Sequence, residues 1–320
     1  MAITCETTIP IEEAVVLERR VPASMLNQAR KGYYARKSPY PVESLVGAFQ
    51  GERFITRQSR IVTMGSCFAQ ELARWLDQHG YSRLPHHWGV IYNPASMRQI
   101  VQYSTEPETW QPAEPFWTDA SNVYDPYRKS DDHAGAYRLG ASVEEAMQRL
   151  EAHRRASRDT LMRADVCVLT LGLTELWRHR ADQAAFFAIP APAFFSEERH
   201  EFHTLTFSEV RGHLDYIVSR LRMLNPNVRI LFSVSPIPLS ISFREKLGPY
   251  VATQESKSVL HAAVLETTQM YEGVHYMPSY EIATGNRAAY FLPDGRHVNA
   301  ACVSTIMQAF ESLYVMGSGA

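Results

Sequence analysis

The hydrophobic residues of this chain form short apolar runs that alternate with longer amphipathic segments. The runs typical of buried strands are 61–64, 166–171, 228–234 and 274–277, with a weaker candidate at 89–92. Apolar residues recur at helical spacing in 68–79, 93–101, 142–163, 206–224, 254–271 and 299–316. This alternation predicts an α/β fold, a three-layer sandwich whose mainly parallel central sheet is covered on both faces.

Polar residues at the starts of three predicted helices support these boundaries. Ser142 with Glu145, and Thr206 with Glu209, have the spacing of a capping box. Asn93 is followed by a proline, which is favoured at the first helical position. We therefore expect these helices to begin at the residues that follow Ser142, Thr206 and Asn93.

The regular pattern begins near Arg60, and this divides the chain into two parts. Prolines at 10, 22, 39 and 41 interrupt any long periodicity in residues 1–58, which we interpret as an N-terminal extension. Residues 59–320 then form one α/β domain. Two stretches of this domain, around 105–139 and 180–205, lack a clear period, and we expect them to be irregular insertions that act as lids or binding loops.

Charge and composition exclude several classes of protein. The 320 residues carry a formal net charge of −2, which argues against a broad nucleic-acid-binding face and against a polybasic membrane-surface protein. We find no uncharged apolar stretch of about 20 residues that would span a membrane. The N-terminus has acidic residues where a secretory signal has a basic start, so we expect a cytoplasmic protein. The 4 widely spaced cysteines predict neither a metal site nor a disulfide framework.

The first candidate site is the turn Gly65-Ser66-Cys67, which joins a predicted strand to a predicted helix. A nucleophile at this place is exposed at the carboxyl edge of the sheet. The positive end of the new helix favours a thiolate and a developing oxyanion. The alternative is a tight turn that buries a small cysteine.

The second candidate is Asp294 with His297, just before the last predicted helix. The histidine can serve as a general base and the aspartate can orient it. An ordinary Asp-Gly turn is the alternative. A third candidate is Thr174 with Glu175 after a buried strand, either as one wall of the same crevice or as the start of a helix.

Together these motifs resemble a family. The pentapeptide Gly65-Ser66-Cys67-Phe68-Ala69 is the signature of the GSCFA family, which resembles the SGNH (GDSL-type) hydrolases, and the resemblance covers roughly residues 60–310. In that superfamily the third position of a Gly-Asp-Ser turn is the nucleophile, and here this position is Cys67. Asp294 and His297 match the Asp-x-x-His block. The resemblance thus implies an SGNH-hydrolase-like catalytic domain.

The resemblance also implies oxyanion donors, and here the chain departs from the pattern. The Gly-x-Asn-Asp block resembles residues 172–175, but Thr174 and Glu175 stand where asparagine and aspartate are usual. Asn93 is a candidate substitute for the missing amide, and Gly89 is a candidate backbone donor. The register of the first turn leaves Ser66 open as an alternative nucleophile to Cys67.

The function expected from these motifs is acyl processing by an esterase, a thioesterase or an O-acyltransferase, acting on a small-molecule or glycan substrate. No cofactor is expected, although acyl-CoA is a candidate co-substrate. The rival hypothesis is a non-catalytic protein on the same scaffold that binds a glycan or an acyl carrier. For Lys257, on a predicted helix, a solvated helix face is favoured over contact with an anionic group.

Overall fold

A computed structural model describes residue 49 and residues 51–130 and 135–317 of the chain. Most of the predicted N-terminal extension, 1–58, lies outside the described residues. Its last part lies against the C-terminal end of the chain, where the amides of Phe54 and Ile55 donate to the Tyr314 carbonyl at 3.0 and 2.9 Å. Ile55 is fully buried, so residues 51–58 are packed on the domain that follows them.

The centre of the molecule is a sheet of four parallel strands in the order β1-β5-β8-β9. These strands are β1 (Ile61–Gly65), β5 (Val166–Leu171), β8 (Arg229–Val234) and β9 (Val274–Met277). All residues of β1 and β5 are buried, as expected for parallel strands covered on both faces. The four strand predictions are confirmed.

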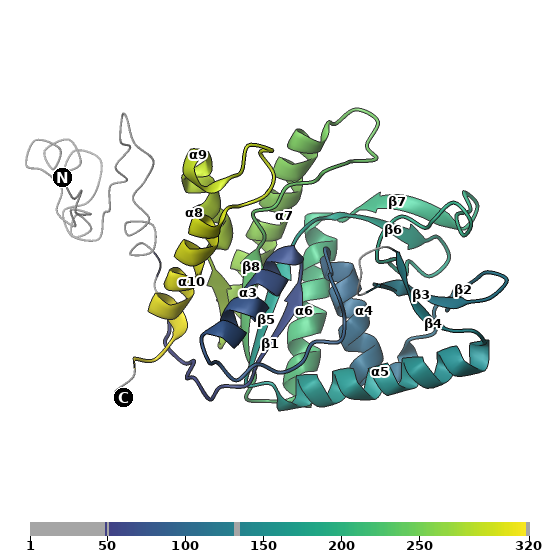
Figure 1. Cartoon of the computed structure of the whole chain (residues 1–320), viewed down its shortest axis with the longest axis horizontal. Coiled ribbons are helices and arrows are strands. Elements are labelled where there is room, and N and C mark those ends of the chain that lie inside the picture. Colours follow the sequence, from purple (N-terminus) through teal and green to yellow (C-terminus); the bar gives the residue numbers. More distant parts are fainter. Residues whose placement is uncertain (1–48, 50, 131–134, 318–320) are drawn as a thin grey trace, which may run out of the picture.

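Helices cover both faces of this sheet (Figure 1). One layer contains α4 (Pro94–Thr105), α5 (Val143–Arg163), α6 (Phe207–Leu224) and α7 (Pro249–Met270). The other contains α3 (Cys67–Gln78), α8 (Ser279–Gly285) and α10 (Ala300–Tyr314), with the short α9 (Arg287–Tyr290) beside them. Along β5, Cys167 and Leu169 pack into the first layer and Val166 and Val168 into the second. The three-layer α/β prediction is confirmed.

The predicted caps explain where the helices start. Thr206 accepts the amide of Glu209, and the Glu209 carboxylate accepts the amide of Thr206, which completes a capping box. Ser142 accepts from the amide of Glu145 at 3.2 Å. Asn93 caps α4 through the amide of Ser96 at 2.8 Å. These bonds satisfy amides that the first helical turn leaves without a partner.

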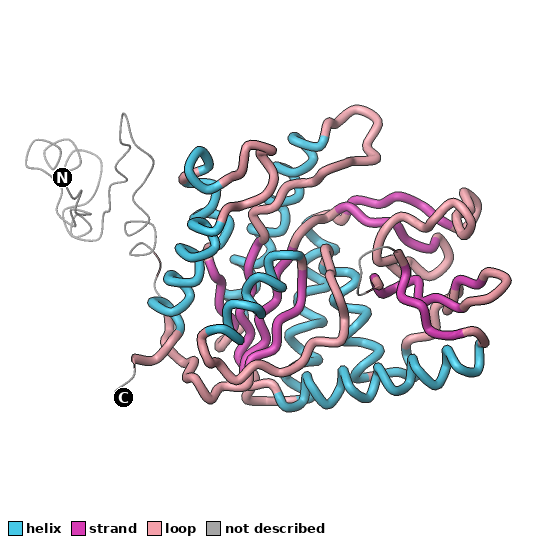
Figure 2. Tube along the Cα trace, in the orientation of Figure 1, coloured by secondary structure: helices cyan, strands magenta, loops and turns pink. Residues whose placement is uncertain are grey.

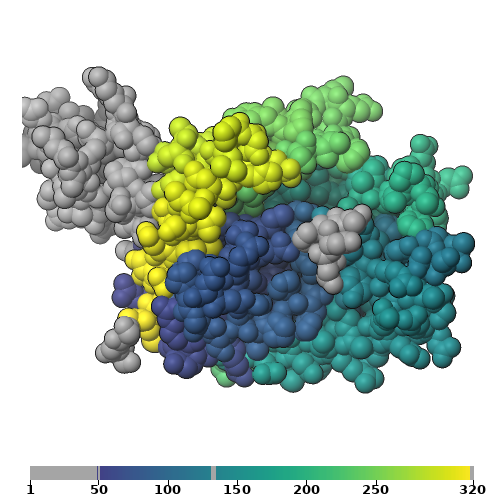
Figure 3. All heavy atoms as spheres, in the orientation of Figure 1, coloured from purple at the N-terminus to yellow at the C-terminus, as the bar shows by residue number. Residues whose placement is uncertain are grey.

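The two insertions contain regular structure, so the prediction of irregular loops was wrong. The first forms a turn of 3₁₀ helix, η2 (Pro107–Thr109), and an antiparallel sheet of β2 (Trp117–Thr118), β3 (Val123–Lys129) and β4 (Ala136–Gly140). In the second, β7 (His200–Thr204) pairs with β6 (Glu175–His179) as an antiparallel hairpin. Register shifts between β3 and β4 hide the alternation that identifies a strand. Figures 2 and 3 show this part of the chain at the end of the molecule opposite α10.

The weaker strand candidate at 89–92 is an extended segment beside β1. It makes a single bridge between Gly65 and Val90, and the Ile91 amide donates to the Gly65 carbonyl at 2.8 Å. One bridge does not make a strand, but it fixes this segment at the carboxyl end of β1. Tyr92, at the end of this segment, and Asn93, just after it, are thereby brought to the same edge of the sheet as Cys67.

Candidate active site

Gly65 allows the sharp turn at the end of β1. Its φ of +147° is a conformation that residues with a side chain rarely adopt. A Cβ atom at this position would lie 2.3 Å from the Thr170 carbonyl oxygen, because the ends of β1 and β5 approach closely here. The chain can therefore leave the sheet and enter α3 within two residues.

The two residues after Gly65 have opposite environments. Ser66 is 3% exposed, its amide donates to the Thr170 carbonyl at 3.3 Å, and its hydroxyl accepts the Phe68 amide at 3.4 Å. Cys67 is the first residue of α3, and its thiol is exposed and free. The hydroxyl thus serves as the helix cap, while the thiol stands at the positive end of the helix.

Asp294 and His297 form a hydrogen-bonded pair in the loop before α10. The Asp294 Oδ2 and His297 Nδ1 atoms are 2.6 Å apart. Asp294 Oδ1 also accepts the amides of Arg296 and His297, at 2.9 and 3.0 Å. The His297 bond, followed by these two amides, lowers the pKa of Asp294 to about 2. With Nδ1 bonded to the carboxylate, Nε2 of His297 is left to accept a proton.

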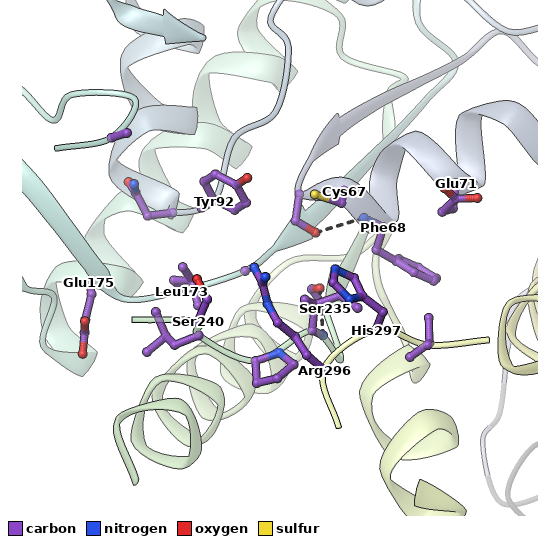
Figure 4. A pocket seen from close by; sticks show the side chains of 18 of the residues that line it. Cys67, Phe68, Glu71, Tyr92, Leu173, Glu175, Ser235, Ser240, Arg296 and His297 are labelled. Atoms are coloured by element: carbon purple, nitrogen blue, oxygen red, sulfur yellow. Dashed lines mark hydrogen bonds between the residues drawn. The ribbon is translucent and has the colours of Figure 1, made fainter. Parts of the chain in front are cut away.

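Cys67 and His297 line one cavity of about 960 Å³ at the carboxyl edge of the sheet. Residues that follow three of the parallel strands reach it: Ser66 and Cys67 after β1, Gly172 after β5 and Ser235 after β8. Figure 4 shows Cys67 and His297 between Glu71 on one side and Glu175 on the other. No direct hydrogen bond joins Cys67 to His297 among the described residues, so that bond stays a prediction.

Tyr92 is a residue of the site that sequence reasoning missed. Burial, and next its interaction and hydrogen bond with the Cys67 thiol, raise the pKa of Tyr92 to about 12. The Tyr92 carbonyl accepts the amides of Gly172 and Leu173, both at 2.8 Å. Tyr92 therefore ties the turn after β5 to the cysteine. Its place at the end of an apolar run and before the Asn93 cap was the signal available in the sequence.

Arg296 was also missed, although it lies between Asp294 and His297 in the chain. It lines the cavity, and its positive charge acts to lower the pKa of Tyr92. Within the part of the chain that the structure describes, its buried Nε atom has no hydrogen-bond partner. The site thus contains a guanidinium close to the tyrosine, in the cavity that Cys67 also lines.

The predicted oxyanion donors separate into two groups. Asn93 lines the cavity, and because its Oδ1 caps α4, its Nδ2 is left as a donor. Gly89 and Thr174 are not among the residues that line the cavity. Thr174 precedes the strand β6 and not a helix, and its hydroxyl lies 2.7 Å from the Ser256 hydroxyl. The structure does not bring these two residues to Cys67.

Glu175 lines the cavity away from Cys67 (Figure 4). Its carboxylate accepts a hydrogen bond from Ser242 at 2.9 Å and lies 3.4 Å from Arg244. Burial raises the pKa of Glu175, and these two partners oppose that effect. Glu175 therefore holds the loop after β8 against the hairpin.

The expectation for Lys257 was wrong, because Lys257 is fully buried on α7. Its Nζ donates to the Gly172 carbonyl at 2.6 Å. Burial lowers the pKa of Lys257 to about 7. Through this bond the lysine, on α7, holds the turn that follows β5. A helical period does not show that a long side chain points inward here.

No group of three or more His, Cys, Asp or Glu side chains in 51–130 and 135–317 is placed to hold a metal ion. No helix among the residues described is both long and apolar enough to cross a membrane.

The comparisons with solved structures give remote likenesses. A family 3 carbohydrate esterase from Clostridium thermocellum is 13% identical with a TM-score of 0.32, covering 81% of this chain and 95% of the other. A carbohydrate esterase family 3 protein from Talaromyces cellulolyticus is 11% identical with a TM-score of 0.32, covering 80% and 95%. At such scores neither likeness bears on the activity of this chain.

Among curated proteins, none matches the chain. The family comparison is decisive by contrast. The model of the GSCFA family matches residues 60–310, which include β1, the Gly65-Ser66-Cys67 turn and the Asp294–His297 pair. The chain belongs to the GSCFA family.

Proposed function

We propose that this protein is an acyl-processing enzyme, an esterase, thioesterase or O-acyltransferase, in which Cys67 is the nucleophile. The observation that carries the proposal is that an exposed, free thiol at the start of α3 shares one cavity with a histidine oriented by an aspartate. A nucleophile, a base and a group that orients the base are the parts that acyl transfer needs.

In the first step the Cys67 Sγ atom forms a bond to the carbonyl carbon of an ester or thioester. The thiol proton passes to Nε2 of His297, and Asp294 stabilises the imidazolium. The tetrahedral intermediate then expels the alcohol or thiol, which takes the proton from His297 as its bond to carbon breaks. Water, or a sugar hydroxyl, attacks the acyl-cysteine in the same way, and this releases the acid or the new ester and restores the thiol.

The oxyanion needs donors close to Cys67. The backbone amide of Cys67 is at the first position of α3, where it has no partner within the helix. We add the Nδ2 of Asn93 and the hydroxyl of Tyr92. With a pKa of about 12, Tyr92 keeps its proton at neutral pH and can donate it in a hydrogen bond. Gly89 and Thr174 have no part in this proposal because they do not line the cavity.

Cys67 is preferred to Ser66 for a geometric reason. The Ser66 hydroxyl is buried and already serves as the α3 cap, whereas the Cys67 thiol is exposed. A brief pulse of p-nitrophenyl butyrate followed by intact-mass measurement tests this choice. We expect one butyryl group, mapped to Cys67, which is lost in Cys67→Ala and kept in Ser66→Ala.

Two results would contradict the proposal in different ways. An adduct on Ser66 that survives Cys67→Ala would move the nucleophile by one residue. If no adduct formed with any ester, thioester or acyl-CoA, the enzyme hypothesis would fall, and a protein that binds a glycan or an acyl carrier would remain. When an adduct forms, its release into water or onto added sugar distinguishes a hydrolase from a transferase.

A further inference from the structure

The cavity extends well beyond the reacting groups into a part that we call the aromatic arm. Its walls include Trp177, Phe187, Ile189, Phe202, Ile241 and Phe243. These residues come from the β6–β7 hairpin, the second insertion and the loop after β8. The whole cavity is near the upper end of the ~300–1,000 Å³ typical of small-molecule sites. An acetyl group at Cys67 would occupy only a small part of it.

The rings of the aromatic arm form one packed surface. The ring centroids of Trp177 and Phe243 are 5.2 Å apart, and the Phe202 ring lies 5.9 Å from Trp177 and 5.7 Å from Phe243. Three of its wall residues are unusually open for apolar side chains, because Ile241 is 60% exposed, Ile189 43% and Phe243 41%. Apolar side chains that are left exposed around a cavity are characteristic of a ligand site.

The charges that line the cavity are distributed unevenly. Glu71 lies on α3, where both of its oxygens accept from Arg74 at 2.6 Å, and Arg296 lies close to Tyr92. The acid that lines the hairpin side is Glu175, which is bonded to Ser242 and faces Arg244. Arg244 is in turn held by both oxygens of Glu255, at 2.6 and 2.7 Å. The walls of the aromatic arm are therefore apolar, and the charge of Glu175 beside them is balanced by Arg244.

We propose that the aromatic arm binds the hydrocarbon chain of the acyl group, so that the substrates are medium-chain acyl esters or thioesters and not acetyl esters. This inference rests on the function proposed above. The arm begins at the cavity that holds Cys67, and a chain attached to the reacting carbonyl can extend into it. Glu71, on α3, lies on the opposite side of Cys67 and His297 from Glu175, and that side is left for the alcohol or thiol part of the substrate (Figure 4).

A series of p-nitrophenyl esters from acetyl to decanoyl tests the inference. Each methylene buried in an apolar site is worth ~0.8 kcal/mol, which is roughly fourfold in kcat/KM. We expect kcat/KM to rise by at least about 100-fold from acetyl to octanoyl. A profile that is flat, or that is highest for acetyl, would overturn the inference while leaving Cys67 as the nucleophile.

Two variants show where the chain binds. Ile241→Asp places a charge in the exposed wall of the arm, and we expect it to reduce the octanoyl-to-acetyl ratio of kcat/KM by about tenfold or more. Val251→Asp is the matched control. Val251 is 50% exposed in the first turn of α7, does not line the cavity and tolerates an acid at a helix start. We expect it to keep the wild-type ratio, and equal losses in both variants would contradict the assigned position.

A binding measurement separates this inference from the proposed chemistry. Calorimetric titration of Cys67→Ala with decanoate and with butyrate needs no reaction. We expect decanoate to bind at least tenfold more tightly, and Ile241→Asp in the same background to remove the difference. Decanoate binding without any acyl adduct on the wild-type protein would support the arm and contradict the enzyme. An adduct without preferential decanoate binding would contradict the arm alone.

Discussion

Two turns at the same edge of the sheet look alike in the sequence and differ in the structure. Each follows a buried parallel strand, contains a glycine and carries a group able to attack or donate: Cys67 after β1 and Thr174 after β5. The Cys67 thiol is exposed and in no disulfide, and it interacts with Tyr92 in the same cavity. Thr174 is 1% exposed, and both its amide and its hydroxyl are bonded to Ser256.

The element that follows each turn accounts for the difference. A helix follows Ser66, so the first residue of α3 lies at the edge of the cavity, and its amide has no partner within the helix. A strand follows Thr174, and α7 packs beneath that turn through Ser256 and through Lys257, which bonds to the Gly172 carbonyl. The comparison shows that a position after a strand does not make a residue catalytic. The packing under the turn decides whether its polar groups are exposed or buried.

The largest effect that we expect comes from removing the base. His297→Ala should reduce acyl transfer by about 10²–10⁴-fold, because the thiol and the leaving group lose their proton acceptor and donor. Thr174→Ala should change kcat by less than about threefold. Turnover and circular dichroism are measured on the same samples. A loss in Thr174→Ala as large as that in His297→Ala would make the second turn catalytic and end the contrast.

The next effect concerns the lysine under the second turn. Burial lowers the pKa of Lys257 to about 7, far below its usual ~10.4, so the unfolded chain binds more protons between these values. The free energy of unfolding should therefore rise as the pH increases from about 7 to 10, by an amount on the order of several kcal/mol. Urea unfolding across this range should show the rise in the wild type and its loss in Lys257→Met. If the free energy of unfolding changed with pH in the same way in the wild type and in Lys257→Met, the buried lysine would not be the cause of the rise.

A smaller effect is expected at the Thr174–Ser256 pair itself. Thr174→Val keeps the shape but removes the hydroxyl–hydroxyl bond, so Ser256 keeps only the Thr174 amide as a partner, and the loss costs about 0.5–1.5 kcal/mol of unfolding free energy. Ser258→Ala, an exposed neighbour on α7, is the control and should stay within about 0.5 kcal/mol. Chemical denaturation measures both. An unchanged midpoint for Thr174→Val would show that the pair does not stabilise the turn.

The smallest effect is expected at Asp294, whose side chain is exposed. Its pKa is lowered to about 2, chiefly by the bond to His297, from a usual value of ~3.9. A carboxylate with a lowered pKa contributes stability above ~3.9 that is lost as the pH falls toward 2. Melting temperatures at pH 5 and pH 3 should therefore differ slightly less for Asp294→Asn than for the wild type. A larger difference in melting temperature for Asp294→Asn than for the wild type would show that the Asp294 carboxylate does not stabilise the fold above pH ~3.9.

The central part of the fold follows from local sequence. The four predicted apolar runs are the parallel strands of the structure, and helices begin after the predicted caps Asn93, Ser142 and Thr206. Strands of this kind are buried on both faces, so their hydrophobicity is continuous and easily recognised. The turn after β1 was also predictable, because Gly65 marks the end of the run.

The insertions could not be predicted in the same way. Their strands are short, one contains Pro126, and their pairing is irregular. Their packing uses aromatic rings such as Trp117 against Phe194, at 5.2 Å between centroids, and not a periodic apolar face. Strands and helices are predicted from the regular spacing of apolar residues, and the insertions show little regular spacing.

For the candidate site, the sequence by itself indicated Asp294, His297 and the Gly65-Ser66-Cys67 turn as candidates, because each belongs to a short motif, and it left Ser66 open as an alternative to Cys67. The Asp294–His297 bond joins residues three apart in the chain and needs only a local turn. Only the tertiary structure decided that Tyr92 meets Cys67, that Lys257 is buried under Gly172, and that Thr174 faces Ser256. The physical reason is that these contacts join segments far apart in the chain. Their geometry depends on how the layers pack, and no local period encodes it.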